Sequence, residues 1–453
     1  MGTTLPTVTA TPGPADPYRR ALADAALPDW LRWTVEIAPR RKTVGLTVEP
    51  RVVTIAVPPT ITPGDLAAAV TAKLRLIEQA ASAPGPDTPG WLGWYDVIII
   101  HTSGGKDSQT AVRRVLAILA AAGVLDRVAV LHLVLDKDPR TSDDEPRIEW
   151  QQVPELAAEQ TARAGIPLSD QQGWAVWNAV EQARARRGRI SLDRAQWAGL
   201  MHYARREVDG DLLDDFASRR KRDGSPRGWA TMWTRYCTSD WKTDVGRAFT
   251  EGICQQIRSE RGLTRPVRVL QVMGFRAEES NDRAARSPFA FNFGVSAATN
   301  RHVWEWLPIH ELTRRDVWAD IAASGVPYHP TYDEGLSRLS CRICIMGSKK
   351  DLAIAKRLAP ATATAYEQVE ADLDDPFQHK RPLASIAAEP GPSGFDVWWT
   401  ACPTCRVRVL ASTRQQQRHC PAHARTGPWL LPSGPAATSC AQQGTLFDLG
   451  TVA

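Results

Sequence analysis

The chain has 453 residues, of which 43% are hydrophobic and 23% charged, the balance of a globular protein with enough length for two or three domains. The net charge of +5 is mild, so it permits an anionic ligand without requiring a nucleic acid. No apolar run approaches the roughly 20 residues that span a bilayer, and residues 1–16 lack the pattern of a secretory signal. We therefore expect a cytoplasmic protein with no membrane partner.

The N-terminal region predicts a leader followed by a small module. Residues 1–28 are expected to form a disordered leader. Alternating apolar and polar residues between positions 30 and 57 predict three short antiparallel strands. A helix is expected over residues 62–80, with a linker at 81–89. Residues 29–90 are thus predicted to form a β-rich module with one helix.

A second domain begins with a strand, a loop, a helix and another strand. Residues 95–101 form an apolar run rich in β-branched side chains, which is typical of a buried parallel strand. A helix is predicted from Ser108 to about Ala122, and Gly123 ends it. Residues 127–136 have the composition of a second buried strand. This order predicts a βαβ unit.

The remainder of this domain is expected to continue the α/β pattern. Residues 150–260 read as helical and Trp-rich, and for the 17 tryptophans of the chain we favour core packing over stacking on bases. A strand is predicted at 267–273 and a helix near 313–324. We expect residues 91–388 to form a doubly wound parallel sheet of the α/β class.

The first turn of this domain predicts a phosphate-binding loop. It consists of Ser103, Gly104, Gly105, Lys106, Asp107 and Ser108. The glycines allow backbone N–H groups to turn toward an anion, and the following helix adds the positive end of its dipole. Lys106 supplies a cation, and Asp107 suits such a site when it holds Mg²⁺ that bridges phosphates. The alternative is a tight turn that binds nothing.

This loop resembles that of the PP-loop ATP pyrophosphatases, and it lacks the GxxxxGK[ST] pattern of a Walker A loop. The resemblance implies an adenine nucleotide alpha hydrolase-like fold. It also implies that the protein binds ATP or a related adenine nucleotide, cleaves between the α- and β-phosphates, and adenylylates an acceptor.

Blocks further along the chain are similar, in the same order, to the phosphoadenosine phosphosulfate (PAPS) reductase-like branch of that family. They are RYCTSDWK at 235–242, GFRAEES at 274–280 followed by Arg283, and SRLSCRIC at 337–344. The similarity covers about residues 94–355. It implies either ATP or PAPS as the nucleotide.

The candidate site residues follow from these blocks and from their chemistry. Arginine and lysine side chains meet phosphate or sulfate oxygens, and Asp136 ends a strand where it could meet a ribose hydroxyl or a metal. The catalytic candidates are Lys106, Asp107, Cys237, Lys242 and Arg276. The nucleotide-binding candidates are Ser103, Gly104, Gly105, Lys106, Asp107, Ser108, Asp136, Gly274, Arg276 and Arg283.

Three functions remain open. PAPS reductases carry a catalytic cysteine in a Glu-Cys-Gly block, which this chain lacks, and Cys440 in TSCAQQ is a poor substitute. Related members transfer sulfur instead, including DndC-like proteins of DNA phosphorothioation. A sulfur-transfer enzyme, with DNA or RNA and a sulfur-donor protein as partners, is therefore the leading interpretation. The alternatives are a thiol-dependent PAPS reductase and a non-catalytic nucleotide- or nucleic-acid-binding module.

The basic clusters bear on the nucleic-acid partner. They lie at residues 40–42, 184–189 and 219–222. Each is either a solvated surface or a contact for phosphate backbone.

The cysteines fall into two groups with CxxC spacing. Relatives that hold an iron–sulfur cluster use cysteines near Cys237 and a later pair, which here is Cys341 and Cys344. Cys254 is a candidate fourth ligand, since such clusters take four thiolates. The alternative is a set of thiols that line a nucleotide site.

The second group predicts a zinc site. Cys402 and Cys405 form one CxxC pair, and Cys420 with His423 forms a second knuckle. Four such ligands suit tetrahedral Zn²⁺ and would organise a segment with little core of its own. We expect residues 395–430 to be this zinc-binding segment and 431–453 to be a tail.

Overall fold

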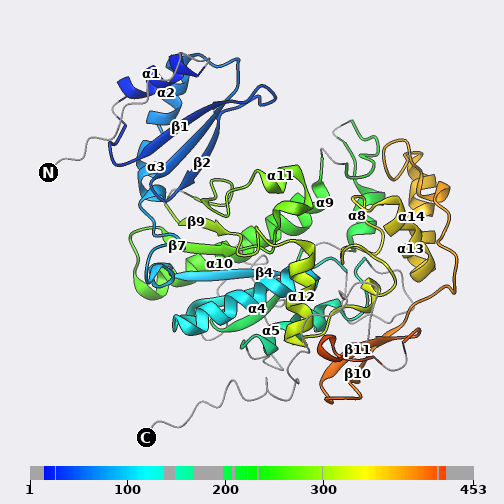
Figure 1. The fold of residues 1–453 in the computed structure, drawn as a ribbon. Coiled ribbons are helices and arrows are strands. Elements are labelled where there is room, and N and C mark those ends of the chain that lie inside the picture. Colours follow the sequence, from blue (N-terminus) through cyan, green and yellow to red (C-terminus); the bar gives the residue numbers. More distant parts are fainter. Residues whose placement is uncertain are drawn as a thin grey trace, which may run out of the picture.

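The structure is a computed structural model with a central α/β domain, an N-terminal module and a C-terminal hairpin (Figure 1). It describes residues 15–25, 27–136, 148–166, 197–206, 210–221, 223–231, 234–297, 299–415 and 418–424. Within these ranges, none of the helices combines the length and the apolar character needed to cross a membrane.

The central domain is built on a six-stranded sheet. Its strands are β4 (Val97–Thr102), β5 (Val128–Val134), β6 (Leu200–Arg205), β7 (Val267–Val272), β8 (Phe289–Phe291) and β9 (Arg301–Trp306). Their order is β6-β5-β4-β7-β9-β8, and all neighbours are parallel except β8, which runs antiparallel at one edge. The predicted doubly wound parallel sheet is therefore present.

Strand β6 lies within the stretch predicted to be helical. Its residues from Met201 to Ala204 are all buried. A strand covered on both faces lacks the alternation of apolar and polar residues by which strands are recognised.

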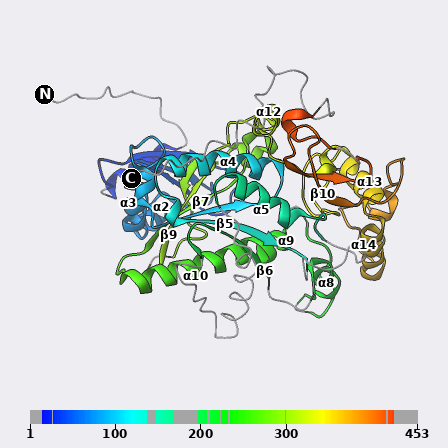
Figure 2. The ribbon, with the colours of Figure 1, turned by 90° about the horizontal axis from the view of Figure 1, so that it is seen from below.

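The two faces of the sheet pack against different helices. These are α4 (Lys106–Ala121), α5 (Val153–Arg163) and α12 (Arg314–Ser324) on one side and α10 (Asp244–Arg261) on the other (Figure 2). Alternate residues of β4 point to opposite faces, so Ile98 and Ile100 join the core with α4 whereas Val97 and Ile99 join the core with α10.

The N-terminal module differs from its prediction in three ways, the first being that residues 62–80 form two helices rather than one. It contains α1 (Asp16–Asp24), β1 (Arg32–Ile37), β2 (Gly45–Glu49), β3 (Val52–Val57), α2 (Pro63–Thr71) and α3 (Leu74–Ala81). Helix α1 occupies part of the predicted leader, and its Leu22 is buried. Strand β3, the most buried of the three, takes the centre of the sheet, and it is antiparallel to β2 but parallel to β1.

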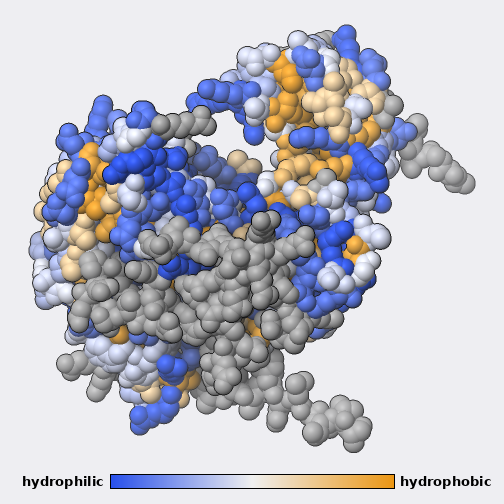
Figure 3. All heavy atoms as spheres, turned by 180° about the vertical axis from the view of Figure 1, so that it is seen from behind, coloured by the Kyte–Doolittle hydropathy of each residue, from blue (hydrophilic) through white to orange (hydrophobic). Residues whose placement is uncertain are grey.

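The module shares a hydrophobic core with the central sheet. The Trp304 indole donates to the Ala80 carbonyl at 3.2 Å, and Trp91 makes edge contacts with Phe289 and Trp306 at 5.7 and 5.0 Å between ring centroids. Figure 3 shows hydrophobic side chains on the module and on the neck that joins it to the rest. These tryptophans therefore pack in a core, as the sequence favours.

The C-terminal part consists of helices and a hairpin. The shorter helices that precede it are α8 (Leu212–Ser218), α9 (Tyr236–Thr238) and α11 (Asn281–Ala284). Helices α13 (Lys349–Leu358) and α14 (Pro360–Leu373) lead to the antiparallel strands β10 (Val397–Ala401) and β11 (Arg408–Ser412). The hairpin is tied to the central domain, since the Val397 N–H donates to the Gln151 side-chain oxygen at 3.1 Å.

Candidate functional site

The glycine-rich loop lies where the strand order reverses. Strand β4 is flanked by β5 on one side and by β7 on the other, and the loop follows the carboxyl end of β4. This switch point is where doubly wound sheets place their ligands. Gly104 has φ +70°, and a Cβ there would lie 3.2 Å from the Val153 carbonyl oxygen. The loop therefore needs glycine at this position.

The two serines form hydrogen bonds within the loop. The Ser108 hydroxyl accepts from the Ser103 N–H at 3.1 Å and donates to the Gly105 carbonyl at 2.9 Å. These bonds hold the turn against the start of α4. That either hydroxyl meets a ligand remains a prediction.

Asp107 lies between two cations. Lys106 Nζ is 2.9 Å from Asp107 Oδ2, and Arg276 Nε is 2.6 Å from Asp107 Oδ1. Both cationic residues are only 4% exposed. Burial by itself raises the pKa of the Asp107 carboxyl, but the charges and hydrogen bonds of Lys106 and Arg276 outweigh it and hold the pKa below its usual value. Three of the catalytic candidates thus meet, and Arg276 also forms an ion pair with Glu278 at 2.5 Å.

Gly274 packs directly against this turn from the end of β7. A Cβ at Gly274 would lie 3.0 Å from the Asp107 carbonyl oxygen and 3.0 Å from Ser108 Cα. Both contacts are with backbone, so a larger residue would displace the first turn of α4.

Asp136 and Arg283 each have protein partners. The Asp136 carboxylate accepts from the backbone N–H groups of Ile148 at 2.5 Å and Glu149 at 3.2 Å. Arg283 forms an ion pair with Glu279 and lies over the Phe275 ring at 4.2 Å. Contact of either residue with a nucleotide stays a prediction.

Two buried residues that the sequence analysis did not select hold the loop. The Tyr332 hydroxyl accepts from the Lys106 N–H and the Leu339 N–H, each at 3.1 Å. The Gln160 amide donates to the Gly104 carbonyl at 3.2 Å. Tyr332 lies between the blocks at 274–283 and 337–344 that are similar to the PAPS reductase-like branch, whereas Gln160 on α5 has no local pattern around it.

Cys237, Cys341 and Cys344 interact electrostatically with the amine of Lys242. Burial would lower the pKa of Lys242, but the neighbouring cysteines and Glu149 raise it, so the amine keeps its charge. A hydrogen bond from Cys341, with smaller contributions that include Lys242, lowers the pKa of Cys344. The cysteine cluster, as we call these three thiols with Lys242, therefore favours a thiolate at Cys344.

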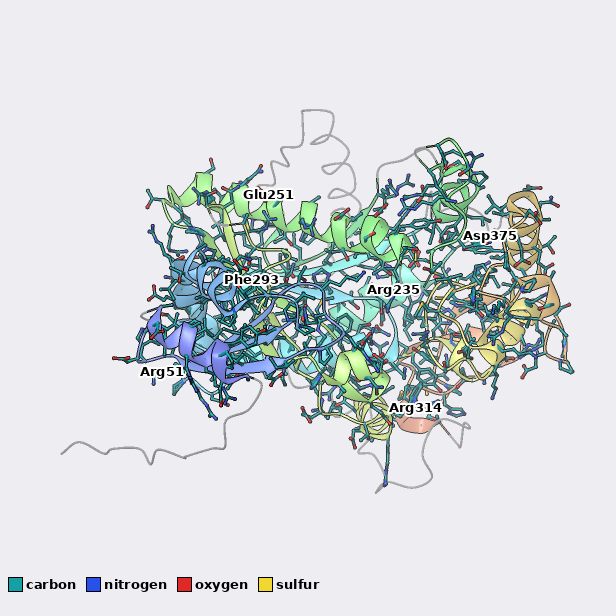
Figure 4. The ribbon with its side chains drawn as sticks, turned by 90° about the horizontal axis from the view of Figure 1, so that it is seen from above. Arg51, Arg235, Glu251, Phe293, Arg314 and Asp375 are labelled. Carbon is teal, nitrogen blue, oxygen red and sulfur yellow. The ribbon has the colours of Figure 1, made fainter. Side chains whose placement is uncertain are left out.

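The cysteine cluster lies close to the carboxyl edge of the sheet. The His132 imidazole of β5 hydrogen-bonds to the Thr102 carbonyl at 3.2 Å and lies 3.7 Å from Glu149, which in turn interacts with Lys242. In Figure 4, Arg235, which precedes α9, lies between the sheet domain and helices α13 and α14. Loop and cluster therefore belong to the same side of the domain.

Cys254 is not a fourth ligand of this cluster. It lies on α10 in the hydrophobic core with Val97 and Val269, where burial raises the pKa of its thiol. Asp96, which precedes β4, influences that pKa, so Cys254 lies toward the opposite end of the sheet. The prediction failed because sequence spacing does not show which end of a helix faces the site.

The C-terminal Cys/His module brings its four predicted ligands together. Cys402, Cys405, Cys420 and His423 place their ligand atoms within 4.8 Å of one another. The Cys405 and Cys420 sulfurs are 3.5 Å apart, and the Cys420 sulfur is 3.0 Å from His423 Nδ1. Within the described residues this is the group that could hold a metal ion, and three thiols with one imidazole fit Zn²⁺.

A mostly parallel sheet with a glycine-rich loop at its switch point defines a doubly wound α/β protein with a candidate nucleotide site. Residues 229–346 match the family model of the phosphoadenosine phosphosulfate reductase domain. The chain therefore carries a segment similar to the PAPS reductase domain. This segment contains the cysteine cluster, Gly274 and Arg276, whereas the loop itself lies outside the matched residues.

Other comparisons are more distant. A search of curated proteins finds no match. Among solved structures, the chain is similar to FMN adenylyltransferase of Candida glabrata in complex with FMN and the ATP analogue AMPCPP, at 11% identity and a TM-score of 0.24. That likeness covers 59% of this chain and spans 63% of the length of the other.

Proposed function

We propose that the protein is an enzyme that binds ATP or a related adenine nucleotide at the loop, cleaves it between the α- and β-phosphates, and uses the product in sulfur transfer. The observation that carries the proposal is the position of Asp107 between Lys106 and Arg276, at the first turn of α4 and at the switch point of the sheet. Two buried cations beside a helix N-terminus suit a polyphosphate.

The roles of the residues follow from their charges. The loop N–H groups and Lys106 would bind phosphate oxygens, and Arg276 would neutralise charge that develops as pyrophosphate leaves. The Asp107 carboxylate is a suitable Mg²⁺ ligand, and Mg²⁺ would supply further neutralisation of the phosphates. Since Asp107 already pairs with both cations, it also fixes their orientation toward the ligand.

The cysteine cluster would supply the sulfur chemistry. A thiolate at Cys344 is a nucleophile at neutral pH, and the protonated Lys242 stabilises it. The three thiols also offer three of the four ligands that an iron–sulfur cluster takes. The other cysteines within the described residues lie elsewhere, so the fit is incomplete and the proposal includes no step through such a cluster.

Analysis of the products formed from ATP tests this proposal. With Mg²⁺, we expect AMP and pyrophosphate rather than ADP and phosphate. The rate of ATP cleavage should fall about a hundredfold or more in Asp107→Asn. Asp87→Asn changes an exposed aspartate in the linker and is the matched control. Formation of ADP, or full activity in Asp107→Asn, would contradict the proposal.

A PAPS reductase is the second candidate, favoured by the family match over residues 229–346. It predicts release of sulfite from PAPS in the presence of a reduced thiol. The reductase would need a catalytic cysteine, and Cys440 lies outside the described residues. Sulfite release that is abolished in Cys440→Ser would support PAPS reduction. Formation of AMP and pyrophosphate from ATP would support the ATP-cleaving enzyme instead. Nucleotide binding without either product would select the non-catalytic module.

DNA or RNA and a sulfur-donor protein remain proposed partners. Of the basic clusters, residues 40–42 are exposed, whereas 184–189 lie outside the described residues. Arg219 is engaged with Asp215 and Asp240. The proposal places the protein in the cytoplasm, where thiols stay reduced.

A further inference from the structure

Tyr332 connects the phosphate loop to a distant part of the chain. Its side chain is 2% exposed, and its ring makes an edge contact with Trp318 at 5.2 Å. Its hydroxyl accepts from the Lys106 N–H, the first amide of α4. The first N–H groups of a helix lack partners within the helix and are the ones that bind phosphate. Tyr332 therefore fixes the backbone at the junction of loop and helix.

The turn that carries Tyr332 is contacted by an arginine of the C-terminal module, in addition to hydrogen bonds from Gln109 and Gln160 of the central domain. Arg418 donates to the Tyr328 carbonyl at 2.9 Å, and its guanidinium lies over the Tyr328 ring at 4.2 Å. It also forms a 2.7 Å ion pair with Asp333, whose other oxygen accepts from the Tyr328 hydroxyl at 2.8 Å. Side chains of both ion-pair partners are less than 10% exposed, so removal of Arg418 would leave Asp333 as a buried, unpaired charge.

Arg418 takes its position from the Cys/His module. It lies two residues before Cys420, and it donates to the Leu410 carbonyl of β11 at 2.8 Å. Val397 and Leu410 of the hairpin pack in a core shared with the central domain, whereas the buried residues around the ligands are only Cys402, Val409 and Cys420, too small a core to hold the knuckles by itself. The ligand set fits Zn²⁺, and a bound ion would fix the segment that presents Arg418.

We propose that Tyr332 is a positioning residue of the phosphate loop, and that the C-terminal Cys/His module holds it in place through the contacts of Arg418 with Tyr328 and Asp333. The inference rests on the proposed function in that it concerns the same loop. The module thus stabilises the nucleotide site in addition to offering a metal site. Loss of its metal loosens the loop without any change to the loop's own residues.

Hydrogen exchange of the full chain without nucleotide tests this directly. The measured quantity is the exchange rate of amides at residues 103–110, in protein loaded with Zn²⁺ and in the same protein after chelation. We expect exchange there to rise about tenfold in Tyr332→Phe, in Arg418→Met and after chelation. Arg408→Met is the matched control, because Arg408 belongs to the same module but stacks on Trp399 instead. This variant should exchange as the wild type does.

Two further readouts keep the outcomes separate. Protection of the α10 amides from exchange reports whether each variant has folded, because α10 lies on the other face of the sheet. Tyr332→Phe removes a single oxygen and keeps the packing of the ring. Unchanged exchange at 103–110 in Arg418→Met and after chelation, in chains with a protected α10, would overturn the proposal. Because no nucleotide is present, failure of ATP cleavage leaves this result intact, and the reverse also holds.

Discussion

The two CxxC pairs have the same spacing but lie in different surroundings. Cys402 and Cys405 face a second knuckle, and four ligand atoms gather within 4.8 Å. Cys341 and Cys344 instead face Cys237 and the amine of Lys242. A cation among thiols balances thiolate charge, and a metal ion bound at the other pair would do the same there. The comparison teaches that spacing brings two sulfurs together, whereas the element packed across from them decides their chemistry.

Loss of a module ligand should give the largest effect. In Cys420→Ser, bound zinc should fall from about one ion per chain to none, since the fold of such a segment depends on its ion. Metal analysis of the purified protein measures this, and circular dichroism follows the hairpin. Cys341→Ser is the control and should retain its zinc. Equal zinc loss in both variants would remove the distinction between the pairs.

Removal of the cation should have an intermediate effect. Lys242→Met should raise the pKa of Cys344 by up to about one unit, because Lys242 is one of the groups that lower it, after the hydrogen bond from Cys341. The thiolate fraction at neutral pH should fall accordingly. Thiolate absorbance followed against pH measures the midpoint. Lys349→Met changes an exposed lysine and should not shift it.

A single methyl group at the loop should have the smallest effect. Gly274→Ala places a Cβ 3.0 Å from backbone atoms of the first turn of α4, so the turn must shift by a few tenths of an ångström. We expect several-fold weaker binding of ATP, measured by calorimetry. Gly93→Ala meets open space and is the control. Wild-type affinity in Gly274→Ala would show that the loop does not bind the phosphates.

Features set by nearby residues could be predicted from the sequence. The loop at residues 103–108 joins an apolar strand to a helix, and the Cys/His ligands of the C-terminal module lie within 22 positions of each other. Both patterns are local, and in the structure the loop follows β4 at the switch point and the four ligand atoms lie together.

Features set by packing could not be predicted. Strand β1 pairs with β3 and not with its neighbour in sequence, β2, and β6 is covered on both faces. Tyr332 reaches Lys106 across 226 positions, and Gln160 reaches Gly104 across 56, so no spacing rule connects them. Cys254 was placed at the wrong site for the same reason, because its neighbours come from distant strands.

Equilibrium binding of ATP with Mg²⁺ to the wild type and to Arg276→Met tests the central claim most directly. Arg276 reaches the loop from beyond β7, so its loss should weaken binding about tenfold or more while Asp107 stays paired with Lys106. Arg286→Met is the matched control, since Arg286 pairs with Glu305 instead and should bind ATP as the wild type does. Absence of ATP binding to the wild type, or equal affinity in Arg276→Met, would contradict a nucleotide site at the loop.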